Sequence, residues 1–311
     1  MDTKIPDRSV LIAFVMAILF AGNNAIAVRF SNVELPPFFG AAIRFSAAAL
    51  ILFLVVIVLR LPLPRGRGVI GALIFGVLGA GLNVALLYWA LGSVQPGTAM
   101  VVLALVPLLT FLFACLHKQE TFNWKALVGG VLAVIGTGIV FSDQLNANVP
   151  ILPLLAVVGA AICFAESTVL IKSYPQAHPI TTNAIAFTVG SVLLFVLSAL
   201  WNETPTLPTL PATWAALFYL IIFGSVATFV LTLYVVKNWT ASASSYQFVL
   251  IPFVTIPMSA LLVTESISVA FLIGGLFVLA GVYIGGIAKT EQLSRFFNGL
   301  WLRRKAPVPD C

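Results

Sequence analysis

The chain has 311 residues, of which 61% are hydrophobic and only 8% are charged. A soluble domain carries about 25% charged residues, so this composition excludes a water-soluble globule, a disordered chain and a disulfide-stapled secreted domain. The 23 glycines and 18 prolines also exclude a long coiled coil, which leaves a polytopic helical membrane protein.

Stretches without any charge alternate with short charged connections along the whole chain. A bilayer core about 30 Å thick takes about 20 helical residues, and a turn signal such as Gln95-Pro96-Gly97 divides a longer stretch into two helices. The stretches are too long for the strands of a membrane barrel. They predict an all-α polytopic protein with ten transmembrane helices, near residues 9–30, 38–60, 69–91, 98–116, 124–141, 151–171, 180–201, 212–236, 242–263 and 267–288.

The first of these helices has an alternative interpretation. Lys4 and Arg8 precede an apolar stretch at residues 11–20 and a small-residue sequence at 25–27, a pattern typical of a cleaved secretory signal. Cleavage would leave nine helices and would break the repeat described next. We therefore expect this segment to be a retained helix.

The second half of the chain repeats the pattern of the first half. Shared proline, glycine and glutamate positions at a single shift are not expected from an apolar composition alone, so the repeat is a strong signal. It predicts one five-helix repeat at residues 1–145, a second at 146–290, and a basic amphipathic tail at 291–311. At a shift of 145 residues, Gly79, Pro107, Thr110, Glu120, Gly129, Gly130 and Gly136 fall on Gly224, Pro252, Thr255, Glu265, Gly274, Gly275 and Gly281, and at a shift of about 143, Asn23 and Asn24 fall on Glu166 and Ser167.

The charges predict how the two repeats are oriented. Five helices are an odd number, so the second repeat must lie upside down relative to the first. With both termini in the cytoplasm, 14 of the 16 Lys and Arg residues lie in the inner segments, as the positive-inside rule requires. Inverted repeats of this kind underlie many secondary transporters and place the substrate site near the middle of the membrane.

With this repeat, the chain resembles the drug/metabolite transporter superfamily in its ten-helix form, which consists of two EamA-type repeats. The resemblance rests on the repeated Pro, Glu and Gly positions and on Arg44 in the second helix, and it covers almost the whole chain. Within the superfamily, the chain is most similar to the bacterial aromatic amino acid exporters of the inner membrane. The resemblance implies export of small metabolites through a central cavity, by alternating access and without a bound cofactor.

Two charged residues lie inside predicted helices and away from the helix ends, where a charge costs about 2.5–3.5 kcal/mol. Counting at about 1.5 Å per residue places Arg44 outward and Glu166 inward of their helix centres, so we expect separate roles rather than an ion pair. Arg44 either meets a substrate carboxylate or is a structural arginine that bonds helix-end carbonyls or reaches the outer interface. Glu166 either contacts a substrate ammonium, or exchanges protons, or is a hydrogen-bonded structural carboxyl.

Uncharged polar residues complete the candidate site. Amides both donate and accept hydrogen bonds, which suits a zwitterion, although bonding between helices would explain them as well. Tyr88 and Trp89 end the third helix, where their rings could stack on an apolar substrate side chain, but rings near helix ends are more often interfacial anchors, which is the role we expect. Pro107 and Pro252 each delete a backbone hydrogen bond near the middle of a helix and are candidate hinges. The candidate substrate-binding residues are Asn23, Asn24, Arg44, Asn83, Glu166, Ser167, Tyr246 and Gln247.

Other chemistries find no support in the sequence. His117 and His178 fall in connections, the three cysteines lack the spacing of metal ligands, and no Walker A, G-x-S-x-G or H-E-x-x-H sequence is present. We therefore expect a transporter and not an enzyme, with no cofactor, no metal ion and no nucleic-acid partner.

We expect this transporter to export neutral amino acids, aromatic ones included, and similar small metabolites across a bacterial inner membrane. Its expected partners are a small-molecule substrate and the lipid bilayer, and its expected state is a monomer or a weak homodimer. One alternative is the same fold with nucleotide-sugars, sugars or cationic drugs as cargo. A more remote alternative is an intramembrane enzyme that acts on a lipid, although such a site needs more than one buried carboxylate.

Overall fold

A computed structural model describes residues 7–121, 124–146, 150–175, 177–239, 241–245, 247–262 and 268–286. Within these ranges the chain forms helices joined by short connections, and it contains no β-strand. Seven of the described helices are long and apolar enough to cross a membrane, and three shorter apolar helices accompany them, at Val128–Val140, Gln247–Leu262 and Val269–Gly281. The basic tail expected at residues 291–311 lies outside the described residues.

The helices follow the expected apolar stretches closely, and several of them begin with a proline in the first turn, where its missing N–H is not needed. The first half contains α1 (Arg8–Gly22), α2 (Asn24–Ser31), α3 (Pro37–Val58), α4 (Arg67–Phe75), η1 (Gly76–Leu82), α5 (Asn83–Ala90), α6 (Pro96–Leu103), α7 (Val106–Leu116) and α8 (Trp124–Asn146). The second half contains α9 (Ile151–Lys172), α10 (Pro179–Leu200), α11 (Pro211–Tyr219), η2 (Leu220–Ala227), α12 (Thr228–Asn238), α13 (Ala241–Ser245), α14 (Gln247–Leu262) and α15 (Val269–Gly286).

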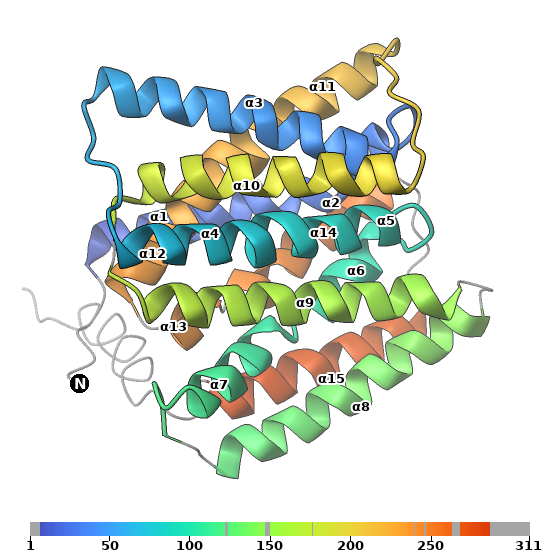
Figure 1. Cartoon of the computed structure of the whole chain (residues 1–311). Coiled ribbons are helices and arrows are strands. Elements are labelled where there is room, and N and C mark those ends of the chain that lie inside the picture. The colour runs from blue at the N-terminus through green and yellow to red at the C-terminus, as the bar shows by residue number, and fades with distance from the viewer. Residues whose placement is uncertain are drawn as a thin grey trace, which may run out of the picture.

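These helices form one bundle with two distinct ends (Figure 1). At the end that carries the N-terminus, α1, α4 and α10 begin, and we call it the N-terminal end; α3 and α11 begin at the opposite end. Helices α3 and α10 lie along one side of the bundle, and α8 and α15 lie along the other. The middle is therefore enclosed by helices from both halves of the chain.

Repeat-related helices pack against each other in antiparallel pairs. A Cβ atom on Gly136 of α8 would lie 2.5 Å from the carbonyl oxygen of Gly274 in α15, and one on Gly281 would lie 2.4 Å from that of Gly129. Gly136 thus meets the residue that corresponds to Gly129 in the other repeat, and Gly281 meets Gly129 itself. Because the residue numbers rise along α15 as they fall along α8, the two helices run in opposite directions. The pair α3 and α10 is antiparallel as well, because Phe38 at the start of α3 contacts Trp201, which follows α10, with ring centroids 5.6 Å apart.

Three membrane-spanning stretches depart from regular α-helix. The stretch Arg67–Ala90 contains the π-helical segment η1, and the stretch Pro211–Asn238 contains η2. The repeat relates the positions of these two segments to each other. π-Helical turns are frequent at functional sites. The first stretch breaks at Asn23, between α1 and α2, and there the hydroxyl of Thr255 in α14 donates to the carbonyl of Gly22. These departures occur where polar side chains from distant helices meet.

Two glutamates connect the halves of the chain at the opposite end. The Glu203 carboxylate accepts hydrogen bonds from the backbone N–H groups of Phe38 (3.0 Å) and Phe39 (2.8 Å), in the first turn of α3. Glu34 accepts from the backbone N–H groups of Thr209 and Leu210, just before α11, and from the Thr209 hydroxyl. A carboxylate at the start of a helix is stabilised by the positive end of the helix dipole. Each carboxylate therefore holds the start of a helix from the other half.

We predict that Gly136→Ala destabilises the protein by about 1–3 kcal/mol, the usual cost of overpacking, because the new methyl group would meet the backbone of α15. Gly138→Ala in the same helix is the matched control, since no atom lies within 4 Å of its Cβ position. Thermal unfolding in detergent measures both variants. Equal midpoints for the two would contradict the close approach of α8 and α15.

We predict a pH-dependent contribution from Glu34. Hydrogen bonds, led by those from the Thr209 and Thr213 hydroxyls, lower the pKa of this carboxyl from 4.5 to about 2. A lowered folded-state pKa stabilises the protein above pH 4.5, and this stabilisation disappears as the pH falls toward 2. Glu34→Gln is therefore expected to lower the thermal midpoint at pH 7 and to have a shrinking effect below pH 4.5. A pH-independent difference between the variant and the wild type would refute this assignment.

Candidate functional site

A cavity lies inside the bundle, between helices of the two halves. Helices α2, α3, α5 and α6 of the first half and α9, α12 and α14 of the second half contribute to its wall. Among the described residues, the lining is mostly apolar, with Arg44 as its one cationic side chain and without Asp or Glu.

Arg44 lies at one end of this cavity and is only 4% exposed. Its Nε donates to the hydroxyl oxygen of Ser225 in η2 at 2.7 Å, and its Nη1 donates to the hydroxyl oxygen of Tyr88 in α5 at 3.1 Å. Its guanidinium carbon also lies 5.0 Å from the centre of the Phe45 ring. No carboxylate in the described ranges forms an ion pair with Arg44. The charge is thus held by neutral groups, and the Nη2 group remains available to a ligand.

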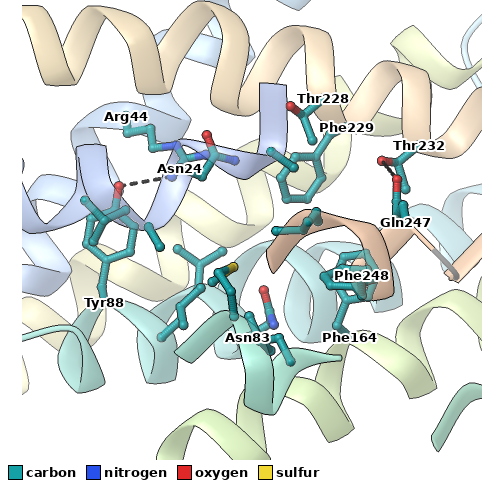
Figure 2. A pocket seen from close by; sticks show the side chains of 18 residues that line it. Asn24, Arg44, Asn83, Tyr88, Phe164, Thr228, Phe229, Thr232, Gln247 and Phe248 are labelled. Atoms are coloured by element: carbon teal, nitrogen blue, oxygen red, sulfur yellow. Dashed lines mark hydrogen bonds between the residues drawn. The ribbon is translucent and has the colours of Figure 1, made fainter. Parts of the chain in front are cut away.

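Asn24 lies beside Arg44, against the π-helical segment η2. Its Nδ2 donates to the carbonyl oxygen of Gly224 at 3.3 Å, while its Oδ1 is buried and has no hydrogen-bond partner. A Cβ atom on Gly224 would lie 2.4 Å from Asn24 Oδ1 and 3.1 Å from Arg44 Nη2. The missing side chain of Gly224 therefore lets an unpaired acceptor and a cationic donor lie next to each other, as Figure 2 shows.

Aromatic rings form the middle of the cavity wall (Figure 2). Phe164 and Phe248 contact each other edge to face, with centroids 4.7 Å apart. Phe229 belongs to an aromatic cluster in which its centroid is 5.1 Å from that of Phe187. At the end of the cavity away from Arg44, the Thr232 hydroxyl donates to Gln247 Oε1 at 3.2 Å. The cavity thus has polar side chains at both ends and aromatic rings between them.

Four of the eight expected site residues line this cavity: Asn24, Arg44, Asn83 and Gln247. Asn83 donates from Nδ2 to the carbonyl of Ala160 at 2.8 Å. Asn23 stands at the break between α1 and α2, outside the lining, and interacts with the Tyr219 hydroxyl. Tyr246 lies outside the described residues.

Glu166 and Ser167 do not line the cavity. The Glu166 carboxylate pairs with His117 Nε2 at 2.7 Å, toward the N-terminal end of the bundle. The Ser167 hydroxyl donates to the Phe164 carbonyl, and its oxygen lies 2.9 Å from the Cβ position of Gly79 in η1. The structure therefore separates these two residues from Arg44 and Asn24.

The two hinge candidates occupy different local structures. Pro107 lies in the first turn of α7, directly after the interruption between α6 and α7. Pro252 lies inside α14, which continues past it and also contains Pro257. Only the first proline coincides with a break in its helix.

The interfacial role expected for Tyr88 is wrong. The ring is buried, it lines the cavity, and its hydroxyl accepts a hydrogen bond from Arg44. The position of Tyr88 close to the end of its helix suggested that the ring lies at the membrane–water interface. Arg44 on the neighbouring α3 instead provides a polar partner inside the bundle. Ser225 and Thr232 were also missed because each lies within a long apolar stretch, although the repeated Gly79 and Gly224 mark the segment that contains Ser225.

In the described ranges, no three His, Cys, Asp or Glu side chains gather closely enough to form a metal site. The polar groups of the cavity are a guanidinium, amides and hydroxyls, which bind organic ligands by hydrogen bonds.

The sequence profile of the EamA-like transporter family matches residues 8–142 and again residues 151–285. The chain belongs to the EamA-like transporter family. It is therefore a membrane transporter and not an enzyme, which confirms the resemblance inferred from the repeat.

Several relatives of this EamA-family transporter match over most of their length. An uncharacterized inner membrane transporter of Escherichia coli K12, YedA, is 29% identical over 85% of this chain and 86% of its own. An uncharacterized transporter of Bacillus subtilis, YyaM, is 25% identical over 85% and 89%. A probable terminal-alkyne amino-acid exporter of Streptantibioticus cattleyicolor is 24% identical over 78% and 81%. A solved crystal structure with 18% identity superposes with a TM-score of 0.68, covering 91% of this chain and all of that one, and so shares the fold.

We predict that Glu166→Gln leaves the affinity of this transporter for its cargo unchanged within about twofold, a difference of less than roughly 0.5 kcal/mol. The reason is that Glu166 pairs with His117 and does not line the cavity. Competition against a labelled cargo measures the affinity, and Asn24→Leu in the cavity wall is the contrasting variant. A loss of tenfold or more in Glu166→Gln would place this carboxylate in the binding site.

Proposed function

We propose that this EamA-family transporter exports neutral amino acids, aromatic ones included, and similar small metabolites. One observation carries the proposal: the buried Arg44 guanidinium and the unpaired Asn24 Oδ1 lie side by side over Gly224, at one end of an acid-free cavity with aromatic walls. An α-amino acid likewise presents a carboxylate and an ammonium group on a single carbon atom. Its two charges match this neighbouring donor and acceptor.

The carboxylate is assigned to Arg44 on electrostatic grounds. A buried charge is costly unless an opposite charge or several hydrogen bonds compensate it. Ser225 and Tyr88 satisfy two of the guanidinium nitrogens, but they do not neutralise its charge. A substrate carboxylate would do so and would form charge-assisted hydrogen bonds with Nη2.

The ammonium group is assigned to Asn24, and the side chain to the aromatic walls. Asn24 Oδ1 is a buried acceptor without a donor, which is the kind of group that a bound ligand completes. The rings of Phe164, Phe229 and Phe248 would contact an apolar or aromatic side chain. Charged side chains find no opposite charge along this wall, which favours neutral amino acids.

The alternative cargoes fit this cavity less well. Nucleotide-sugars carry several negative charges, and the lining offers Arg44 as its one cationic side chain. Cationic drugs call for a carboxylate, while Glu166 is engaged by His117 outside the lining. Uncharged sugars leave the Arg44 charge uncompensated.

We also propose alternating access by two inverted five-helix repeats, at residues 1–145 and 146–290, with both termini cytoplasmic. The antiparallel pairs α3 with α10 and α8 with α15 support this arrangement, since inverted repeats exchange conformations around a central site. The printed name of YedA, an inner membrane transporter, supports a place in the bacterial inner membrane. A relative named as a probable amino-acid exporter supports the cargo class.

Proteoliposomes with the purified protein test the proposal. We expect labelled phenylalanine to leave loaded vesicles faster than protein-free vesicles, and external phenylalanine to compete. In Arg44→Ala we expect the affinity for phenylalanine to fall by roughly 10- to 100-fold, because a hydrogen bond to a charged group is worth about 1.5–3 kcal/mol. The affinity for phenylalanine amide, which lacks the carboxylate, changes much less.

Arg29→Ala is the matched control, since Arg29 bonds the Val94 carbonyl outside the cavity lining. An equal loss for the acid and the amide in Arg44→Ala would make Arg44 a structural residue. No protein-dependent flux across a panel of neutral amino acids would overturn the proposed cargo.

A further inference from the structure

Gln247 stands at the end of the cavity away from Arg44 (Figure 2). It is the first residue of α14, its side chain is only 3% exposed, and it lines the cavity. The Thr232 hydroxyl on α12 donates to its Oε1 at 3.2 Å. The primary amide is therefore held by a neighbour on another helix.

This hydrogen bond determines which part of the amide faces the cargo. Because Oε1 accepts from Thr232, the two N–H groups of Nε2 are left over, and no side chain or backbone group in the described ranges accepts from them. The hydroxyl of Thr228, which also lines the cavity, donates to the Phe223 carbonyl at 2.7 Å. Gln247 thus presents donors at the far end of a cavity whose middle is lined by aromatic rings.

The positions of the two ends define how a bound amino acid would lie. If the carboxylate is on Arg44 and the ammonium is on Asn24, the side chain must extend along Phe229 and Phe248 toward Gln247 (Figure 2). The tip of a long side chain then meets the Nε2 donors. A phenol tip satisfies both partners, since its oxygen accepts from Nε2 and its O–H donates to the Thr232 oxygen, which keeps a free lone pair.

We propose that Gln247 selects amino acids whose aromatic or extended side chain ends in a hydrogen-bond acceptor oxygen, over side chains of the same shape with an apolar tip. Thr232 is a positioning residue that holds the amide in its donating orientation. This inference rests on the proposed function, because it requires the head group to bind at Arg44. A site built to bond a polar substrate group discriminates against the analogue that lacks it, since its own buried groups are then unpaired.

The experiment compares tyrosine, phenylalanine and 4-aminophenylalanine as competitors of labelled phenylalanine exchange in proteoliposomes. The wild type is expected to bind tyrosine more tightly than phenylalanine. In Gln247→Met, which keeps the length of the side chain and removes the donors, the preference for tyrosine is expected to fall about tenfold, the effect of one lost hydrogen bond to a polar tip. The readout is the ratio of the tyrosine affinity to the phenylalanine affinity in each variant, so a change that affects both amino acids equally does not alter it.

Two further variants keep the test independent of folding defects. Gln247→Glu replaces the donors by acceptors at the same place, so it is expected to favour 4-aminophenylalanine, whose tip donates, over tyrosine. Thr232→Val releases the amide and is expected to reduce the tyrosine preference severalfold while phenylalanine is still exchanged. Gln119→Met is the matched control, because the Gln119 amide bonds Val169 and Ser173 and lies outside the cavity lining.

The outcomes separate this inference from the proposed function. Phenylalanine exchange with the same tyrosine preference in wild type, Gln247→Met and Gln247→Glu would overturn the role of Gln247 and leave the cargo class standing. No exchange of either amino acid by the wild type would overturn the proposed cargo and this inference together. A change in the preference that appears equally in Gln119→Met would also overturn it.

Discussion

The site depends on one physical constraint, which is a guanidinium group buried in an apolar helical bundle. A charge in this position must be compensated or it destabilises the fold. The described residues around Arg44 offer it two hydroxyl oxygens and the face of an aromatic ring, but no carboxylate. Its hydrogen bonds are thus partly satisfied while its charge is not. Under the proposed function, this imbalance is what attracts the carboxylate of the cargo to Arg44.

The repeat supplies the scaffold, and differences between the repeats supply the chemistry. The two π-helical segments contain the related residues Gly79 and Gly224, and each glycine receives a polar residue from the other half. Gly224 receives Asn24, a cavity-lining residue whose buried Oδ1 has no hydrogen-bond partner, whereas Gly79 receives Ser167, whose hydroxyl is engaged by its own helix. The same close approach therefore leaves an unpaired acceptor on one side and a satisfied hydroxyl on the other.

The sequence predicts the helices and the repeat well, because apolar length and repeated glycines depend only on local composition. It also predicts Asn24, Arg44, Asn83 and Gln247 in the cavity, since polar side chains within apolar helices must face polar surroundings. The sequence-based prediction fails where the position of a side chain depends on a partner from another helix. Arg44 holds the Tyr88 hydroxyl inside the bundle, whereas His117, at the end of α7, holds Glu166 outside the cavity lining. The sequence pattern of a single helix does not predict these contacts between helices.

The placement of Glu166 has a consequence for the whole cavity. Paired with Arg44, this carboxylate would have neutralised the guanidinium and removed the attraction for an anionic cargo. His117 holds it at 2.7 Å instead, outside the lining. Because the cavity keeps one uncompensated positive charge, an uncharged cargo cannot neutralise it, and a cation would add a second positive charge at low dielectric. Under the proposed function, discrimination between cargoes thus begins with the separation of two opposite charges that the same bundle contains.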